Sequence, residues 1–508
     1  MKIKRLSICN FRSIKELNVY ASDLCALIGP NSAGKSNILK AIDLVLGEGW
    51  TTKAKIAREL FNNPENPIII EIEFVSPIVY TNSKGYEDNI AKIKLEMRLS
   101  PELYAKTTIN ESVPFYSQEQ FKKLCHFIYI PSERQLSSEL RVSRWTMLGK
   151  LMKIIYENYI GKYGGDELKL KKDFAGKIKM AKDFLEDDFT AEEITFNKFR
   201  ESFKRHCLEN SSGLASEFEP ILDIYNLNWF YKTLQIHVKE DLPEKHFDSE
   251  EVGAGMQNLL MISIFQTYAD LMGGKVVFGI EEPEMYLYPQ AQRALYNNLI
   301  KLSKNTQIFY STHNQNFVDA SRPEDIILLR KNAEKGTYKL EKDESFNKEN
   351  AEKQWHKIYT HFNTERNELF FAKKVLLVEG DSDKILFSTL CEDKWGIDLD
   401  AAGISIISCG GKGGVNYFVG VCKLIGFNDY FAAWDHDDDK YTPQKNYLAG
   451  VLTAKKGLEI PGKLETFISD LPEGKDAEKI KNAYEWAMKV KEENIPSEFV
   501  KIKEYLVS

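Results

Sequence analysis

Long apolar segments are missing from this sequence of 508 residues. No run approaches the roughly 18 consecutive apolar residues that a membrane-crossing helix needs. The first residues, MKIKRLSICNFRSI, alternate like a strand and lack the apolar core of a signal peptide. We therefore expect a cytoplasmic protein without membrane contact. The length suggests two to four domains, and the shares of hydrophobic (43%) and charged (28%) residues are normal for globular domains.

Cysteine pairs with metal-ligand spacing are also missing. The seven cysteines include no CxxC pair, which argues against structural zinc and against a disulfide framework. An excess of positive charge is missing too, because the formal net charge is −7. Local basic segments such as 169–182 could still contact phosphates, although a solvated helix face is the plainer interpretation.

A phosphate-binding loop is present near the start of the chain. Residues 29–36, GPNSAGKS, match the pattern GxxxxGK[ST] completely and precede a predicted helix over 35–47. Backbone N–H groups of such a loop curl around phosphates at the positively polarised start of the helix. We expect Lys35 to contact the β- and γ-phosphates of ATP and Ser36 to hold Mg²⁺. The residues expected to bind nucleotide here are Asn31, Ser32, Ala33, Gly34, Lys35 and Ser36.

Three later segments extend this site. An apolar run ends in Glu281 and Glu282, which we expect to hold the water shell of Mg²⁺ and to polarise the attacking water, respectively. His313 follows the next apolar strand, where it would sense the γ-phosphate. Gly255 lies in VGAGMQNLL, a glycine-rich turn that opens a helix before the acidic pair. Acidic residues at a strand end and a structural histidine are the plainer alternatives.

The order of these four segments resembles that of ABC-type ATPases, with the glycine-rich turn as their signature motif. The opening IKRLSICNFRSIKELNV followed by LIGPNSAGKSNILKAI is similar to the SMC/RecF branch, which works on DNA. The resemblance implies a homodimer or higher oligomer whose ATPase heads enclose ATP, with Arg12 near the nucleotide and Gly255 facing the other copy. Ala254 replaces the usual signature serine, which removes a hydrogen bond to a charged group worth roughly 1.5–3 kcal/mol. We therefore expect slow hydrolysis, or ATP acting as a conformational ligand.

A second group of carboxylates lies in the C-terminal part. Glu379 ends the apolar run VLLVE, Asp383 lies one helical turn later, and Asp435 and Asp437 follow another apolar run. Oxygen ligands gathered at strand ends suit Mg²⁺ or Mn²⁺ rather than zinc. Paired divalent metals are a standard means of cleaving phosphodiesters. For either segment alone, an acidic loop with helix-capping aspartates is an equal alternative.

These segments resemble a Toprim domain, the metal-binding fold of topoisomerases, primases and some nucleases. The resemblance implies Glu465, in IPGKLETFI, as a further metal ligand and Lys463 as a cation that stabilises the cleaved phosphate, with Lys475 as a competitor. Lys412, in SCGGKGGVNYF, could meet a phosphate, although a plain turn lysine is the more ordinary interpretation.

An SMC/RecF-like ATPase followed by a Toprim domain is similar to the architecture of the OLD (overcoming lysogenization defect) family. The resemblance implies an α/β fold: an ABC-type P-loop ATPase with a helical insertion, then a Toprim domain with a parallel sheet. It also implies that Arg134, in YIPSERQLS, faces nucleotide or DNA. The expected boundaries are 1–144 and 236–332 for the ATPase, 145–235 for the insertion, which is also the expected dimerisation region, 333–370 for a linker and 371–508 for Toprim.

The implied function is a metal-dependent DNA endonuclease that ATP regulates, in defence against phage or foreign DNA. Family members include the nuclease subunit of Gabija-type systems, which would bring a UvrD-like helicase as a partner. Two alternatives stay open. One is a RecF-like, ATP-driven DNA-repair clamp without cleavage, and the other is a Toprim nuclease that acts on RNA.

Overall fold

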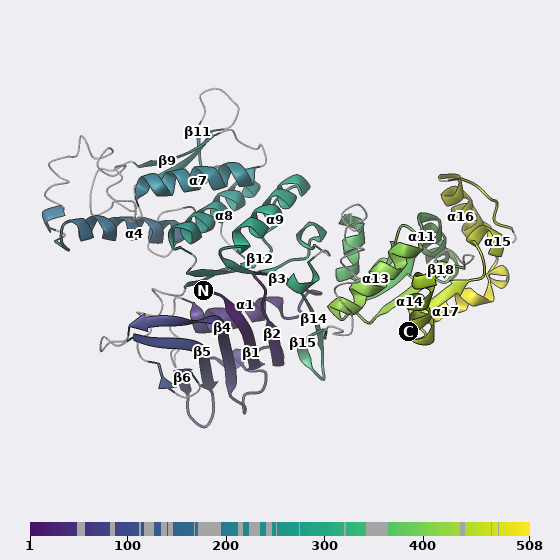
Figure 1. Cartoon of the computed structure of the whole chain (residues 1–508), viewed down its shortest axis with the longest axis horizontal. Coiled ribbons are helices and arrows are strands. Elements are labelled where there is room, and N and C mark those ends of the chain that lie inside the picture. The colour runs from purple at the N-terminus through teal and green to yellow at the C-terminus, as the bar shows by residue number, and fades with distance from the viewer. Residues whose placement is uncertain are drawn as a thin grey trace. The chain divides into compact units, whose positions relative to one another are not determined.

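The computed structural model divides the chain into two compact units (Figure 1). The N-terminal unit comprises Met1–Leu27, Gly34–Phe317 and Lys331–Tyr338, and the C-terminal unit comprises Ile28–Ala33, Val318–Arg330 and Lys339–Ser508. The structure describes residues 1–47, 56–81, 87–110, 113–115, 126–133, 140, 146–166, 168–170, 195–211, 217–222, 234–239, 246–249, 251–273, 275–319, 322–341, 364–436, 442–468, 470–475 and 477–508.

A large mixed sheet carries the first part of the chain. Its order is β7-β6-β5-β4-β1-β2-β15-β14-β3-β13-β12-β8. The strands are β1 (Ile3–Phe11), β2 (Ile14–Tyr20), β3 (Leu24–Ile28), β4 (Ile68–Thr81), β5 (Glu87–Arg98), β6 (Tyr104–Ile109), β7 (Val113–Pro114), β8 (His126–Ile130), β12 (Val276–Glu281), β13 (Gln307–Ser311), β14 (Ile326–Asn332) and β15 (Gly336–Lys339).

The two ends of this sheet differ in sequence pattern and in strand direction. The strands β1, β2, β4, β5 and β6 pair antiparallel, and β1 alternates buried and exposed residues because only one face packs on the core. The strands β3, β13, β12 and β8 pair parallel. Every residue of β3, β12 and β13 is buried, as expected for strands covered on both faces. The phosphate-binding loop follows β3, the predicted acidic pair lies at the end of β12, and His313 follows β13.

Helices cover this parallel region, which fits the burial of its strands on both faces. They are α1 (Lys35–Leu46), α4 (Met147–Lys162), α7 (Phe196–Ser211), α8 (Ala254–Leu271) and α9 (Pro289–Ser303). Figure 1 shows α7, α8 and α9 side by side, and α7 contacts both of the others. Buried Asn210 joins the three helices, since its amide donates to Ser263 (3.0 Å) and Gln266 (2.6 Å) and its oxygen accepts from Asn298 (2.5 Å).

The predicted helical insertion also contains a strand. Residues Glu217–Leu222 form β9, which pairs antiparallel with β10 (Leu234–Lys239), and β10 pairs with β11 (His246–Asp248). The helical insertion expected at 145–235 therefore includes β9 and the start of β10 besides its helices. Phe218 is buried in this small sheet, and period-two burial of this kind favours a strand over a helix. Most of the basic segment 169–182 lies outside the described residues.

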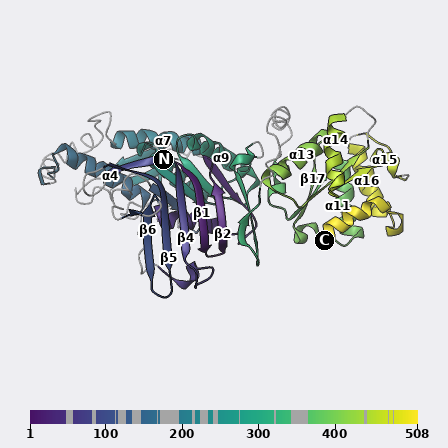
Figure 2. The same cartoon turned by 60° about the horizontal axis from the view of Figure 1, so that its bottom comes forward.

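The C-terminal unit contains the expected parallel sheet. Its order is β17-β16-β18-β19, formed by β17 (Ile404–Ser408), β16 (Lys374–Val378), β18 (Tyr430–Asp435) and β19 (Gly457–Ile460), all parallel. The helices are α11 (Asp381–Thr389), α12 (Leu399–Ala402), α13 (Lys412–Ile425), α14 (Thr442–Thr453), α15 (Leu464–Phe467), α16 (Ala477–Lys489) and α17 (Val500–Val507). They surround the sheet, as the turned view in Figure 2 shows. This unit confirms the predicted α/β class.

The direction in which the chain winds through this sheet reverses between two of its central strands. The chain runs from β16 to β17 on one side and then to β18 on the other, so the direction of winding reverses between β16 and β18. In open parallel sheets, ligands bind at such a reversal, outside the carboxyl ends of the strands.

Within the described residues, no helix is both long enough and apolar enough to cross a bilayer.

Candidate functional site

The phosphate-binding loop has the strand, loop and helix arrangement that its sequence predicts. The backbone is left-handed at Ser32 (φ 63°) and Gly34 (φ 101°). A Cβ atom at Gly34 would lie 2.3 Å from Oγ1 of Thr337, so only glycine fits there. The loop exposes Asn31 and Ser32 and buries Ala33, and α1 begins at Lys35 directly after it.

Lys35 is buried beside the acidic segment. Burial lowers the pKa of its ammonium group to about 8, although the charges of Glu282, Glu281 and Glu284 act in the opposite direction. Partial desolvation and the charge of Lys35 both lower the pKa of His313. The structure thus brings together four residues predicted from distant segments, namely Lys35, Glu281, Glu282 and His313. The charge of Lys35 would balance that of a polyphosphate bound beside it.

Glu281 ends β12 and is held by an extensive set of donors. Its Oε1 accepts from the hydroxyl of Tyr129 (2.9 Å), and its Oε2 accepts from the backbone N–H and the hydroxyl of Ser132 (both 3.0 Å). Burial acts to raise the pKa of Glu281, but hydrogen bonds from Ser36, Ser132 and Tyr129 outweigh it and keep the pKa below its usual value. Ser36 and Glu281 are therefore adjacent, as two groups sharing one hydrated Mg²⁺ must be.

Glu284 connects the acidic segment to the histidine, a role that the sequence did not reveal. Its Oε1 accepts from the hydroxyl of Thr312 (2.5 Å) and from the backbone N–H of His313 (3.2 Å). Its Oε2 is buried without a hydrogen-bond partner in the described part of the chain. Burial raises the pKa of this carboxyl. Glu282, the preceding acid, has left-handed backbone (φ 44°) and donates its N–H to Ser311 (2.9 Å).

The predicted signature turn opens α8 and touches the loop after β12. Ala254 is the first helical residue and is exposed. A Cβ atom at Gly255 would lie 2.7 Å from the carbonyl oxygen of Tyr286, so this glycine permits a close backbone approach. The amide of Asn258 donates to the carbonyls of Pro283 (3.0 Å) and Met285 (2.9 Å).

Arg12 lies on the Glu281 side of this site. Its backbone is left-handed (φ 52°), and its guanidinium stands 5.7 Å from the ring centre of Phe11. Burial and the charge of Glu281 raise the pKa of Tyr129, while the charge of Arg12 acts to lower it. Arg12 is thus electrostatically coupled to the tyrosine that holds Glu281.

The second site lies where β16 and β18 end, at the reversal of the C-terminal sheet. Glu379 follows β16, and its Oε2 accepts from the backbone N–H of Asp435 (3.2 Å), the last residue of β18. Asp383, in the first turn of α11, is buried and accepts from the N–H of Gly380 (2.9 Å). Asp435 Oδ2 accepts from the N–H of Leu464 (3.3 Å), whereas its Oδ1 is buried without a hydrogen-bond partner in the described residues.

Like charges dominate this second site. Burial and the charges of Glu379 and Glu465 raise the pKa of Asp383 to about 7. Burial and the charges of Asp383, Glu379 and Glu465 raise the pKa of Asp435 to about 8. Ionising both carboxyl groups together is therefore costly, and a divalent cation bound between them would relieve that cost. The structure brings together four of the five predicted ligands, and the fifth, Asp437, lies outside the described residues, as does Arg134.

A lysine that the sequence analysis did not single out completes the cluster. Glu465, on α15, pairs with Lys479 of α16 at 2.8 Å. Burial acts to raise the pKa of Glu465, but Lys479 outweighs it and keeps the pKa low. The charges of Asp435 and Asp383 help to raise the pKa of Lys479. The predicted Lys463 is exposed at the start of α15, and the competitor Lys475 is also exposed.

Lys412 takes a structural place beside this cluster. It is buried at the start of α13, and its ammonium group donates to the backbone carbonyl of Asp435 at 2.6 Å. The turn before it is also tied to the site, because Gly411 donates its N–H to the carbonyl of Glu379 (2.7 Å). Lys412 therefore fixes the end of β18.

The carboxylates fit a hard divalent cation by their chemistry. Oxygen ligands are the ones that Mg²⁺ and Mn²⁺ prefer, and the buried Oδ1 of Asp435 needs a positive partner. Among the described residues, no three His, Cys, Asp or Glu side chains stand together as ligands of one metal ion. Carboxylates that repel one another stand apart when no cation lies between them.

Comparisons with known proteins assign both halves of the chain. The family model described as AAA ATPase domain matches residues 1–97 and 78–318. The model described as overcoming lysogenization defect protein-like, TOPRIM domain, matches residues 370–437. Among solved structures, an Smc head bound to the C-winged helix domain of ScpA is 16% identical and covers 67% of this chain and 97% of that chain, with a TM-score of 0.47.

Curated relatives span nearly the whole sequence. An OLD nuclease of Thermus scotoductus is 30% identical over 86% of this chain and 82% of its own length. The Old nuclease of Escherichia phage P2 is 25% identical over 84% of this chain and 76% of its own length. Endonuclease GajA of Bacillus cereus is 23% identical over 93% of this chain and 82% of its own length. The two domains imply the use of a nucleotide and of divalent metal ions, and the chain belongs to the OLD family of nucleases.

Proposed function

We propose that this chain is a DNA endonuclease in which four carboxylates of the C-terminal unit hold Mg²⁺ or Mn²⁺ at the scissile phosphate. The observation that carries the proposal is the buried Oδ1 of Asp435. It has no hydrogen-bond partner in the part of the chain that the structure describes, and it lies at the sheet reversal among carboxylates that repel one another. The proposed ligands are Glu379, Asp383, Asp435 and Glu465, together with Asp437. When bound there, divalent cations supply an activated water and neutralise the charge of the leaving oxygen.

The chain's own groups position the substrate in this proposal. Lys479 pairs with Glu465 and feels the charges of Asp435 and Asp383, whereas Lys463 contributes only a weaker charge effect on Glu465. We assign Lys479, in place of Lys463, to the negative charge that develops on the cleaved phosphate. Lys412 holds the carbonyl of Asp435, so its role is to keep the end of β18 in place.

We further propose that ATP at the N-terminal site regulates cleavage. Lys35 would bind the β- and γ-phosphates, Ser36 and Glu281 would share the hydrated Mg²⁺, and Glu282 and His313 would face the attacking water and the γ-phosphate. Exposed Ala254 and Gly255 would complete the site of a second copy in a head dimer. Since Ala254 lacks a hydroxyl, hydrolysis would be slow and ATP would stay bound for long periods. Defence against phage or foreign DNA, with or without a UvrD-like helicase partner, is the proposed setting.

The test is plasmid nicking with Mg²⁺ or Mn²⁺, measured with and without ATP. We expect wild type to nick DNA and Glu379→Ala to lose nicking while still binding ATP. Lys35→Ala should retain the metal-dependent chemistry and lose the response to ATP. Nicking that survives Glu379→Ala would contradict the metal site, and equal rates with and without ATP in wild type would contradict the regulation. The same assay on RNA separates the two nucleic acids.

A further inference from the structure

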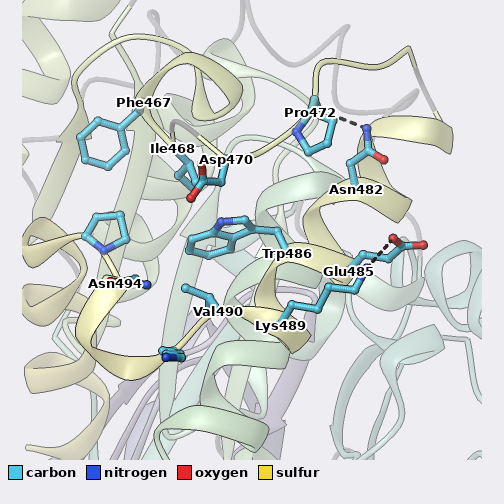
Figure 3. Close-up of a pocket in the computed structure, with 12 residues that line it drawn as sticks. Phe467, Ile468, Asp470, Pro472, Asn482, Glu485, Trp486, Lys489, Val490 and Asn494 are labelled. Atoms are coloured by element: carbon cyan, nitrogen blue, oxygen red, sulfur yellow. Dashed lines mark hydrogen bonds and ion pairs between the residues drawn. The ribbon is translucent and has the colours of Figure 1, made fainter.

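A pocket of about 490 Å³ lies in the C-terminal unit, apart from the carboxylates described above. It is bounded by α15, α16 and the 3₁₀ turn at Glu492–Asn494. Figure 3 shows the indole of Trp486 in the middle of the lining, with Asp470 on one side and Val490 on the other. Its volume falls within the range of about 300–1,000 Å³ that is usual for sites of small organic groups.

The lining suits a flat, uncharged group with polar edges. Trp486 and Phe467 supply aromatic surface, and both are only partly buried where they pack against the core of this unit. The charged lining residues balance, because Lys489 and Lys491 are matched by Asp470 and Glu485, and Lys489 pairs with Glu485 at 3.2 Å. A phosphate would gain little from such a lining, whereas a nucleobase presents an aromatic face and a hydrogen-bonding edge.

The pocket is joined to the carboxylate cluster by both of its helices. Phe467 lies two residues after Glu465 on α15. On α16, Lys479, the partner of Glu465, precedes Trp486 by seven residues, which is roughly 10 Å along a helix at 1.5 Å per residue. One DNA strand advances about 3.4 Å per nucleotide, so this distance corresponds to roughly three nucleotides.

We propose that this pocket binds one unstacked nucleobase of the substrate strand, about three nucleotides from the scissile phosphate. The inference rests on the proposed function, because it takes the carboxylate cluster as the place of cleavage. Stacking on an indole holds any base, and extruding a base from a duplex is least costly where the base is already unpaired. The enzyme would therefore favour DNA with an unpaired or mismatched nucleotide near the cut.

The first test needs only the wild-type protein. A set of identical oligonucleotides, each with one abasic residue at a different distance from the cut, is cleaved in the presence of Mn²⁺. We expect cleavage about tenfold slower when the abasic residue is roughly three nucleotides from the cut, and little change at other distances. Equal rates for every abasic position would overturn the proposal.

The second test uses matched tryptophan variants of the full chain. Trp486→Leu should weaken binding of single-stranded DNA about tenfold and remove the dependence on abasic position, and Trp486→Phe should keep most of both. Trp395→Leu is the control, since Trp395 is also partly buried against the same core but does not line the pocket. Melting temperatures of all three variants identify any that are misfolded.

The outcomes separate the two proposals. Wild type that cuts no DNA with any divalent metal overturns the proposed function itself. Wild type that cuts DNA, together with Trp486→Leu that binds and discriminates like wild type, overturns the base pocket alone. Loss of a partner protein from Trp486→Leu with unchanged DNA behaviour would likewise overturn it, in favour of a protein occupant.

Discussion

The two candidate sites contrast in how their charges are balanced. At the nucleotide site, Glu281 accepts hydrogen bonds from Tyr129 and Ser132, and Lys35 faces the acidic segment. At the carboxylate cluster, burial and neighbouring carboxylates raise the pKa values of Asp383 and Asp435, and Oδ1 of Asp435 has no hydrogen-bond partner among the described residues. Glu281 of the first site is thus compensated by donors of the chain itself, whereas at the second site Lys479 compensates Glu465 but leaves the repulsion between Asp383 and Asp435 in place. A bound divalent cation would relieve that repulsion.

The largest effect expected from this contrast is on cleavage. Asp435→Asn removes a ligand without changing the size of the side chain, and we expect nicking to fall roughly a thousandfold, equivalent to about 4 kcal/mol of barrier. Without divalent metal, the same variant should melt at or above the wild-type temperature because it relieves repulsion. A variant that melts several degrees lower in EDTA would show that Asp435 stabilises the fold by itself.

Metal binding should also stabilise the C-terminal unit directly. At a Mn²⁺ concentration a hundred times its Kd, wild type should gain about 2.7 kcal/mol in unfolding free energy. Calorimetry with and without metal measures this gain. Asp435→Asn should lose most of it, whereas Lys35→Ala should keep it. An equal gain in all three proteins would place the metal elsewhere.

At the nucleotide site, Glu281→Gln should lower the stability of the protein without ligand, in contrast to Asp435→Asn at the carboxylate cluster. Glutamine brings two N–H donors to a place surrounded by the donors of Tyr129 and Ser132, so we expect a loss of about 1–3 kcal/mol even without ligand. Denaturant unfolding of the apo protein measures it. A neutral outcome would mean that the hydrogen bonds around Glu281 contribute little before nucleotide binds.

A glycine pair tests the shape of the phosphate loop. Gly34→Ala meets Thr337 and a left-handed backbone, so we expect a loss of about 1–3 kcal/mol and much weaker ATP binding. Gly161→Ala, inside α4 with open space around its Cβ position, should instead be neutral or stabilising by up to about 1 kcal/mol. Isothermal titration with ATP and thermal melts distinguish the two.

The smallest effect concerns a carboxylate that has basic partners. Burial acts to raise the pKa of Asp270, but hydrogen bonds from His206 and Ser202 and the charge of Arg205 outweigh it and hold the pKa below its usual value. Asp270 therefore stabilises the fold above pH of about 4, and this contribution fades as the pH falls further. Asp270→Asn should lower stability by less than about 1 kcal/mol at pH 7 and by nothing near pH 2. Urea unfolding at both values measures the difference.

Local motifs predicted much of this molecule. The phosphate loop, the acidic strand end and the carboxylates after β16 and β18 each depend on a short run of residues, so their secondary structure followed from the sequence alone. The segment that holds Tyr129 and Ser132 was singled out only for Arg134. Their contact with Glu281 was not predicted because they approach it only when β8 pairs beside β12, about 150 positions along the chain. Lys479 was missed for a similar reason, since its place depends on how α16 packs against α11.

The hydrogen bonds of Asn258 have a mechanical consequence. Asn258, in the first turn of α8, donates to the carbonyls on either side of Glu284. Glu284 in turn accepts from the backbone N–H of His313. A continuous chain of hydrogen bonds thus joins the first turn of α8 to the loop that carries His313. If two heads dock at exposed Ala254 as proposed above, these hydrogen bonds would connect the docking surface to the backbone of His313 in the same subunit.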